Sequence, residues 1–359
     1  MKESRTSRYD PLSAYRRETL RKITFLFLLL VLLVLIALLA IGLGSSDMSR
    51  MDALRGLIGT GGETEKIVIW RIRMPRIVTA IIAGVGLAAS GAIMQTVLRN
   101  PIGSPITLGI SQSAAFGAAF AVVVLGAGSV GSGMVDAVVT DNIYVVSLFA
   151  FLASLVSTGV IIFLARFKRA SPESMILTGV AMGSLATAGT TAMEYFADEV
   201  QLASIIFWTF GDLGRTGWDD IAIMFIVSVP VLILFVWNGW KFNAMDAGEE
   251  TARSLGINTE ALRLLGLGAS SLLTAVIISI VGIIGFIGLV VPHIMRKLIG
   301  GDQRFLIPGS AVAGAVLLLS ADTVARTVIA PIVLPVGIIT SFLGAPLFIY
   351  LVIRGKEHW

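Results

Sequence analysis

Side chains that commonly catalyse reactions or bind metals are scarce in this chain. Cysteine is absent and histidine occurs only at His293 and His358, so neither a thiolate site nor a His-rich metal site can be assembled. The sequence contains no GxxxxGKS/T nucleotide motif, no HExxH zinc motif and no GxSxG nucleophile motif. We therefore predict no catalytic residue, no metal site and no cofactor bound by this chain. Any energy for work must enter from another chain.

Protein–protein recognition is instead indicated by one charged segment, residues 241–263. Its 23 residues carry seven charged side chains, whereas the 20 residues before it and the 32 residues after it carry none. A charged segment between two membrane spans must lie in water at a face of the bilayer. It is too short to form a domain, so we predict that the charged segment is a docking surface for a soluble partner.

A second group of charges precedes the second apolar stretch, in the sequence WRIRMPR at 70–76. Pro75 suits the first turn of a helix, where its missing N–H costs nothing. Arg73 and Arg76 would then crown that helix at the outer surface of the membrane. Two interpretations are open: the arginines snorkel to lipid phosphates, or they form a basic patch that receives an acidic extracellular partner.

The elements that position these groups are membrane-spanning helices. The chain is 56% apolar and only 14% charged, against about 25% charged residues in soluble domains. A helix needs about 20 apolar residues to cross the hydrocarbon core. Leu264–Met295 is too long for one such helix, and Gly282, Gly285, Gly288 and Pro292 predict a tight turn within it. The sequence therefore predicts ten spans, at 23–43, 77–98, 104–125, 143–165, 174–196, 219–240, 264–284, 286–300, 306–325 and 335–353.

Orientation follows from the positive charges. The basic leader, residues 1–22, precedes an apolar run of 21 residues, which is longer than the roughly 7–15 residues of a signal peptide. With the N-terminus inside, the inner loops hold 19 of the 27 Lys and Arg residues and the outer loops hold eight. We therefore predict a cytoplasmic leader, a transmembrane domain at 23–354 and a cytoplasmic tail at 355–359, with the charged segment inside.

Two spans have distinctive faces. Gly84, Ala88 and Gly91 are spaced so that another helix can approach the second span closely in lipid. The fifth span is rich in hydroxyl side chains, which either bond back to carbonyls of their own helix or line a wet cavity. Their number on one span favours the cavity, with Thr178, Thr187 and Thr191 as candidate lining residues.

Ionisable residues within the spans are few. Asp322 and Arg326 are four positions apart on one helix, and we predict that they pair. Nothing resembles a proton relay or a voltage sensor at the membrane midplane. The absence of a buried carboxylate pair argues against an ion-coupled transporter.

Taken together, these segments resemble the transmembrane subunit of iron-chelate, haem and cobalamin ABC importers, the FecCD/BtuC-type permeases. The resemblance extends from about residue 28 to residue 354, and the order and spacing of its motifs make it specific. The motifs are RMPR at 73–76, GLAASGAIMQTVLRNPIGSPITLGIS at 86–111, ILTGVAMG at 176–183, FWTFGDLG at 207–214, ARSLGI at 252–257, GFIGLVVPHIMR at 285–296, LLLSADTVAR at 317–326 and LPVGIITSFLGAPLFIYLV at 334–352.

This resemblance implies an all-α polytopic protein with ten membrane helices, in which helices 2–5 and 7–10 form related halves of opposite orientation. It also implies a second permease copy around a central pathway, two cytoplasmic ATPase subunits that use ATP and Mg, and a substrate-binding protein outside. The protein would lie in the plasma (inner) membrane of a prokaryote with both termini in the cytoplasm. No nucleic acid is implied as a partner.

Several residues match functional positions of the family. Arg73, Arg76 and Arg326 match arginines that meet glutamates of the binding protein. The charged segment matches helices that couple to the ATPases, through Asp246, Gly248, Glu249, Ala252, Leu255 and Gly256. The positions that match the cytoplasmic gate are Asn100, Ile102, Glu173 and Ser174. The match is imperfect at 172–173, where Pro-Glu replaces a more Ser/Thr-like stretch.

The expected function is thus an importer pore without chemistry of its own, with an iron–siderophore chelate as the first candidate cargo. Haem and corrinoid (vitamin B12-type) chelates are alternatives, and the second copy is identical or a paralogue. The rivals from other classes are an ion-coupled secondary transporter working alone and an integral-membrane enzyme, for which ligands and nucleophiles are scarce.

Overall fold

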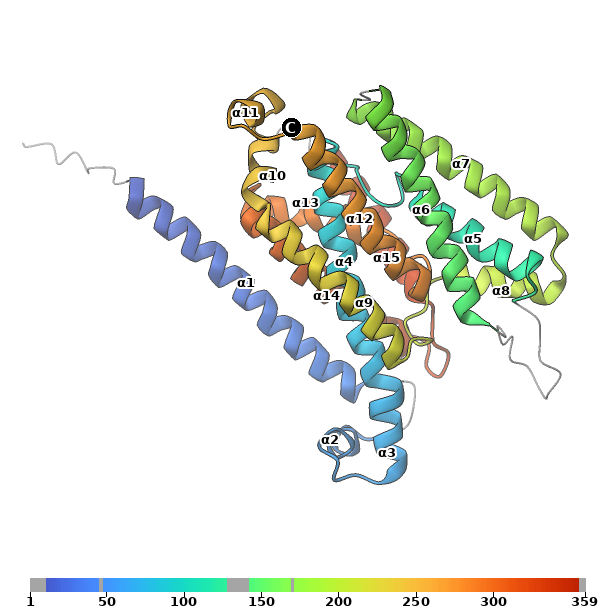
Figure 1. The fold of residues 1–359 in the computed structure, drawn as a ribbon. Coiled ribbons are helices and arrows are strands. Elements are labelled where there is room, and N and C mark those ends of the chain that lie inside the picture. The colour runs from blue at the N-terminus through green and yellow to red at the C-terminus, as the bar shows by residue number, and fades with distance from the viewer. Residues whose placement is uncertain (1–10, 45–47, 128–141, 169–170, 355–359) are drawn as a thin grey trace, which may run out of the picture.

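The computed structural model describes residues 11–44, 48–127, 142–168 and 171–354, and all regular secondary structure in these ranges is helical (Figure 1). Residues 1–10 of the predicted leader and the predicted tail at 355–359 lie outside the described residues. Each of the ten predicted spans corresponds to a helix. These helices are α1 (Pro11–Gly42), α4 (Met74–Val97), α5 (Ile110–Val124), α6 (Ile143–Lys168), α7 (Pro172–Phe196), α9 (Trp218–Trp237), α12 (Thr259–Val281), α13 (Ile287–Ile299), α14 (Gln303–Thr327) and α15 (Val336–Arg354).

Six further short elements lie between these helices in the described part of the chain. They are α2 (Arg50–Ile58), α3 (Glu63–Ile67), the π-helical segment η1 (Val68–Arg73), α8 (Glu199–Thr209), α10 (Gly239–Asp246) and α11 (Glu249–Ser254). Side-chain caps explain where several helices begin. Ser49 caps α2, Ser171 caps α7, Asp198 caps α8 and Asn258 caps α12, each by accepting a hydrogen bond from a backbone N–H of the first turn.

Seven helices in the described ranges are long and apolar enough to cross a bilayer, whereas α5 and α15 are shorter apolar helices and α13 has only 13 residues. The predicted start of the third span at residue 104 is wrong, because the chain forms turns until Gly109 and α5 begins at Ile110. Pro101 and Pro105 disfavour a helix there. The hydroxyl of Thr107 donates to backbone carbonyls and so stabilises the turn.

The chain repeats one pattern of helix lengths. Helices α4 to α7 have 24, 15, 26 and 25 residues, and α12 to α15 have 23, 13, 25 and 19 residues. Helix α4 begins at the end of the bundle that carries α2 and α3, whereas α12 begins at the opposite end beside α11 (Figure 1). The two groups therefore run in opposite directions, as expected for inverted halves.

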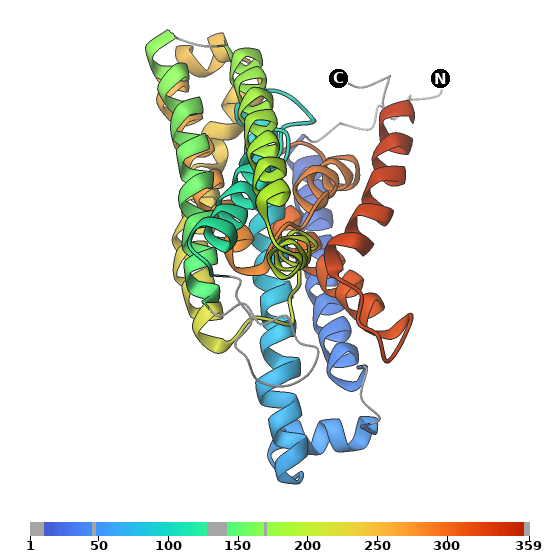
Figure 2. The same ribbon diagram turned by 90° about the vertical axis from the view of Figure 1, so that its right-hand side faces the viewer.

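We name the end with α2 and α3 the outer end and the opposite end the inner end, following the orientation predicted from the positive charges. Helix α1 begins, and α15 ends, at the inner end (Figure 2). The hairpin of α10 and α11 lies at the same end (Figure 1). The described starts and ends of these elements thus agree with an even number of spans.

Helix α4 is at the centre of the bundle and is buried over most of its length, packed against α12, α13 and α14. Its small residues permit this packing, as predicted. A Cβ atom at Gly84 would collide with the carbonyl oxygen of Gly314 on α14, and one at Gly91 would collide with that of Gly288 on α13. Close backbone approach of this kind is how helices associate in lipid.

The predicted break between the seventh and eighth spans is confirmed. Helix α12 ends at Val281 and α13 begins at Ile287. Gly282 has φ 80° and Phe286 has φ 65°, both in the left-handed region that a helix cannot use. Glycine tolerates this backbone without cost, so Gly282 ends α12 cleanly.

The predicted start of the second span near Pro75 agrees with the start of α4 at Met74, but helical structure already begins at Glu63 and passes through η1 into α4. A proline inside an α-helix removes one backbone hydrogen bond and clashes with the carbonyl four residues earlier. The π-helical turn avoids this conflict, with the Met74 N–H donating to the Ile69 carbonyl five residues back. It also leaves the Trp70 carbonyl to accept a hydrogen bond of 2.9 Å from Nε1 of Trp218 on α9.

Candidate functional site

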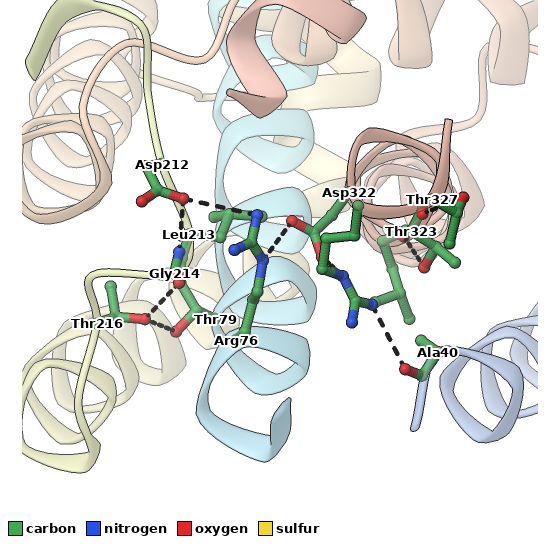
Figure 3. A network of polar contacts seen from close by, with 12 residues as sticks. Ala40, Arg76, Thr79, Asp212, Leu213, Gly214, Thr216, Asp322, Thr323 and Thr327 are labelled. Carbon is green, nitrogen blue, oxygen red and sulfur yellow. Dashed lines mark hydrogen bonds and ion pairs between the residues drawn. The ribbon is translucent and has the colours of Figure 1, made fainter. Parts of the chain in front are cut away.

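At the outer end, a buried ion-pair network joins α4 to α14 (Figure 3). The guanidinium of Arg76 on α4 donates from Nε to Oδ1 of Asp322 on α14 at 2.8 Å. Asp322 is completely buried, and its Oδ2 lies 3.0 Å from Nε of Arg326 one turn later. This confirms the predicted Asp322–Arg326 pair and adds Arg76, which no local spacing indicated.

The loop before α9 completes this network. Oδ1 of Asp212 lies 3.6 Å from Nη2 of Arg76 and accepts a hydrogen bond from the N–H of Gly214. Beside it, the hydroxyls of Thr79 on α4 and Thr216 are 2.7 Å apart (Figure 3). Two arginines and two aspartates therefore balance in charge. We define Arg76, Asp212, Asp322 and Arg326 as the outer network.

Arginines from this region also hold the end of α1. Arg326 donates from Nη1 to the Leu43 carbonyl at 3.1 Å, and Arg73 donates from Nη1 to the Ile41 carbonyl. The last carbonyls of a helix have no partner within the helix and carry partial negative charge, so cationic donors stabilise them.

The expectation that Arg73 and Arg76 crown a helix at the outer surface is wrong. Arg73 is 4% exposed and Arg76 is 8% exposed, because the helix continues outward through η1 and the neighbouring elements cover both side chains. Arg71, two residues before Arg73 on η1, is exposed. The three candidate docking arginines, Arg73, Arg76 and Arg326, therefore lie together at one end of the molecule, but their side chains are buried.

Sequence reasoning missed Arg215, which follows Asp212 in the same loop. Its Nε donates to the Ile280 carbonyl at 2.9 Å, and its guanidinium lies over the ring of Trp208 at 5.7 Å from the centroid. Burial lowers the pKa of Arg215 to about 10, against the opposing attraction of Asp212 and Asp220. Arg215 thus remains charged at neutral pH and fixes the loop against the end of α12.

At the inner end, the charged segment folds into α10, α11 and the first five residues of α12. Gly248, with φ 122°, turns the chain between α10 and α11. Ala252 and Ile257 are buried and anchor α11 to the bundle. The side of α11 that faces away carries the exposed residues Glu250, Arg253, Ser254 and Leu255.

The candidate coupling residues therefore divide into two groups. Ala252 is fully buried, and Glu249 is half-buried with its carboxylate directed toward the bundle. Asp246 is exposed, and its carboxylate accepts a hydrogen bond of 2.6 Å from Nε2 of Gln303 on α14. Leu255, 61% exposed, and Gly256 remain at the surface, where a soluble partner could contact them.

Glu249 accepts three hydrogen bonds. Its Oε1 accepts from Arg253 at 2.9 Å and from the Thr259 hydroxyl at 3.1 Å, and its Oε2 accepts from Arg263 at 3.2 Å. Burial alone would raise the pKa of the Glu249 carboxyl, but the Thr259 hydrogen bond and the Arg263 charge outweigh it and lower the pKa. Glu249 is therefore ionised at neutral pH.

The first candidate gate turn follows α4. Asn100 accepts from the Ile102 N–H at its Oδ1, 2.9 Å away, and its own N–H donates to the Gln95 carbonyl. Ile102 is exposed. A cleft of about 790 Å³ opens beside this turn, lined by Gln95, Arg99, Asn100, Pro101, Asn243, Asp246, Arg296, Gly301 and Asp302. The structure thus places gate candidate Asn100 and coupling candidate Asp246 on one cleft.

The second candidate gate turn starts α7. Glu173 and Ser174 are exposed in its first turn, and the Ser174 N–H donates to the capping hydroxyl of Ser171. A smaller cleft of about 270 Å³ separates this turn from α11. It is lined by Ala165, Ser171, Pro172, Met175, Glu249, Arg253, Glu260, Arg263 and Leu264.

The candidate lining residues lie along α7. Thr178 and Thr187 donate to the carbonyls of Ser174 and Gly183 at 2.8 and 2.9 Å, which is the back-bonding alternative. Thr187 and Thr191 are nevertheless exposed in the single chain and lie one turn apart on one face. A hydroxyl that donates to its own helix can still accept a hydrogen bond from water. Hydrogen bonds within α7 are therefore compatible with a wet cavity along this helix.

None of the described residues form a group of three or more His, Cys, Asp or Glu side chains that could hold a metal ion. The polar features that the described residues do form are exposed charge on α11, buried ion pairs at the outer end, and a hydroxyl-bearing face on α7.

Comparison with known proteins agrees with this arrangement. The chain is 52% identical over 340 residues to an ABC transporter permease protein of Methanocaldococcus jannaschii, covering 95% of this chain and 97% of the relative. It is 36% identical over 320 residues to the hemin transport system permease protein HmuU of Yersinia pestis, covering 89% and 93% of the two chains.

A solved structure described as an inward-facing conformation of a metal-chelate type ABC transporter superposes with a TM-score of 0.80 at 30% identity. The similarity covers 92% of this chain and 99% of that chain. Residues 30–354 match the model of the FecCD transport family. By sequence and by fold, this chain is therefore a member of the FecCD transport family.

Proposed function

We propose that this chain is the membrane-spanning permease subunit of an ATP-driven importer that moves an iron chelate inward across the inner membrane of a prokaryote. The observation that carries this proposal is the folded charged segment, which is anchored by Ala252 and Ile257 and presents Glu250, Arg253 and Leu255 outward. The relatives support it, because they are permeases and two of the compared proteins are described by a chelate cargo.

In this proposal two copies of the chain enclose the pathway, and an ATPase subunit binds α11 of each. The face of α7 that holds Thr187 and Thr191 would line the pathway. Thr178 lies nine positions before Thr187, on the opposite side of the helix, and would not belong to that face. The turns that hold Asn100 and Ile102, and Glu173 and Ser174, would form the inner gate. ATP and Mg would be used by the ATPase subunits, and the permease would bind no cofactor of its own.

A substrate-binding protein would dock at the outer end. The resemblance assigns this role to Arg73, Arg76 and Arg326, which the single chain holds on internal carboxylates and carbonyls. Direct ion pairs with an acidic partner would require these guanidinium groups to exchange internal partners for external ones. Exposed Arg71 needs no such exchange and would supply the long-range attraction.

The proposal is tested by reconstituting the chain with its ATPase and binding protein in liposomes. We expect uptake of a ferric siderophore that requires ATP on the α11 side. Uptake of haem or a corrinoid instead would change the assigned cargo but would leave the proposed ATP-driven import mechanism unchanged. Uptake driven by an ion gradient without ATPase would overturn the proposal in favour of a secondary transporter.

Orientation is tested separately, because the chain has no native cysteine. A single Ser254→Cys variant, exposed on α11, should react with a membrane-impermeant thiol reagent only from the cytoplasmic side. Labelling of intact cells from outside would place the charged segment on the wrong face and would refute the ATPase role.

A further inference from the structure

Arg263 occupies an unusual position among the charges of the inner end. It lies in the second turn of α12, and its side chain is 9% exposed. Its Nε donates to the carbonyl of Val97 at 3.1 Å, and its Nη2 donates to Oε2 of Glu249 at 3.2 Å. One guanidinium from α12 therefore binds the last residue of α4 and the first residue of α11.

The Val97 end of this connection leads directly into the first candidate gate turn. Val97 is the final residue of α4, and carbonyls in the last turn of a helix lack partners within it. The next residues form the turn, in which Arg99 has φ 47° and Asn100 donates back to Gln95. Arg263 thus fixes the point at which the turn leaves the helix.

Glu249, the second partner of Arg263, is also fixed in place by other hydrogen bonds. Glu249 is the first residue of α11, and Thr259 and Arg253 donate to its other carboxylate oxygen. An arginine fork with two directional bonds to ionised and carbonyl oxygens is a stiff connection, because its planar donors are fixed relative to one another. A displacement of α11 would therefore be passed to Val97 through Arg263.

The second candidate gate turn lacks such a connection in the described part of the chain. The cleft of about 270 Å³ that contains Ser171 and Pro172 on one side and Glu249 and Arg263 on the other separates α11 from the start of α7. The two gate turns are thus connected differently: one is bonded to α11 through Arg263, and the other faces it across an open cleft.

We propose that Arg263 is a positioning residue that transmits movement of α11 to the gate turn at 98–103. This inference rests on the proposed function, and it assigns the transmission to one side chain within the permease. It predicts that α11 and this turn move as one unit, while the α7 turn moves relative to both.

The test uses spin labels at Ser254→Cys and Ile102→Cys in the complex with the ATPase, since both positions are exposed and the chain has no other cysteine. Distances are measured by pulsed electron paramagnetic resonance without nucleotide and after trapping with ATP and vanadate. We expect the 254–102 distance to stay constant in the parent, and a 254–174 distance, with Ser174→Cys, to change.

Arg263→Gln should make the 254–102 distance dependent on nucleotide and lower uptake per ATP hydrolysed by roughly tenfold. The matched control is Arg304→Gln, which removes an exposed ion pair with Asp302 at the same end of the molecule and should behave like the parent. If the glutamine variant does not fold, Arg263→Lys replaces it in the test. Lysine keeps the positive charge but lacks the two fixed N–H donors, so its effect on the 254–102 distance and on coupling should be intermediate.

The outcomes separate the two proposals. A parent complex that neither binds an ATPase nor changes either distance with nucleotide refutes the proposed function itself. A functional parent in which Arg263→Gln, or folded Arg263→Lys, matches Arg304→Gln in both distances and coupling refutes the role of Arg263. A 254–102 distance that already changes in the functional parent also refutes it.

Discussion

Arg76 Nε donates to Asp322 Oδ1 at 2.8 Å, although 246 positions separate these residues in the chain. The fully buried Asp322 carboxylate also pairs with Arg326 at 3.0 Å. Because Asp322 is the buried counter-charge of two guanidinium groups, we expect Asp322→Asn to destabilise the protein by about 3–5 kcal/mol. Thermal unfolding of the purified protein in detergent measures this loss.

The control for Asp322→Asn is Glu63→Gln, which removes a carboxylate from the same end of the molecule. The Glu63 side chain is 87% exposed and lies 3.8 Å from Lys66, so its removal should change stability by less than about 1 kcal/mol. Equal melting temperatures for the two variants would contradict a stabilising role for the outer network.

Close packing around α4 gives a second prediction. A Cβ at position 91 would fall on the Gly288 carbonyl oxygen, so Gly91→Ala must push α4 and α13 apart and should cost about 1–3 kcal/mol. Gly159→Ala on α6 has nothing within 4 Å of the new atom and should be neutral or stabilising by up to about 1 kcal/mol. Melting temperatures compare them, and a tolerated Gly91→Ala would refute the contact.

Exposed charge at the outer end gives a third prediction. Arg71→Glu reverses a side chain that lies outside the outer network, so the melting temperature should not change. Association with an acidic binding protein should slow by roughly tenfold at low salt, since long-range attraction mainly sets the on-rate. Biolayer interferometry at two ionic strengths measures this. An association rate unaffected by the reversal would exclude Arg71 from the docking surface.

The face of α7 gives a fourth prediction. Single Thr187→Cys and Thr191→Cys variants in the cysteine-free chain should react with a water-soluble thiol reagent in membranes, because their face would line a hydrated pathway. Leu185 is also exposed in the single chain but lies on the opposite side of the helix, so Leu185→Cys should be protected. The reverse pattern of labelling would place the lipid on the threonine face.

Gly256 gives a fifth prediction. Its φ is 77° with no neighbour within 4 Å of a Cβ, so a side chain would be opposed by backbone conformation rather than by space. Gly256→Ala should therefore distort the end of α11, at a cost of about 1–2 kcal/mol, and weaken ATPase association. Gly256→Asn should be closer to the parent, because asparagine tolerates this conformation. Co-purification yield measures the difference, and equal losses would indicate a steric contact instead.

The arrangement of helices along the chain could be predicted from the sequence, because each signal is local. Apolar stretches of sufficient length mark the spans, and the glycines at 282 and 285 mark the break before α13. The i,i+4 spacing of Asp322 and Arg326 likewise fixed their pairing. The extension of α4 through η1 to Glu63 could not be predicted in this way, since Pro75 is compatible either with a first turn or with a π-helical turn in a longer helix.

The connections between distant residues could not be predicted from spacing. Nothing local relates Arg76 to Asp322, or Arg263 to Val97, because tertiary packing alone brings these groups together. Burial of Arg73 was missed for the same reason: the covering elements, including the end of α1, lie elsewhere in the chain. Nothing in the sequence therefore indicated that the side chains of Arg73, Arg76 and Arg326 are buried.

The hydrogen bonds that Arg73 and Arg326 donate to carbonyls at the end of α1 have a consequence for biosynthesis. The Leu43 carbonyl accepts a hydrogen bond from Arg326, which is synthesised 283 residues later. Among the described residues, α1 packs mainly against α14, so it cannot complete its contacts until α14 has been synthesised. A ribosome-bound intermediate stopped before α14 would thus carry a loosely tethered first helix, which is when quality-control proteases would have their best access to it.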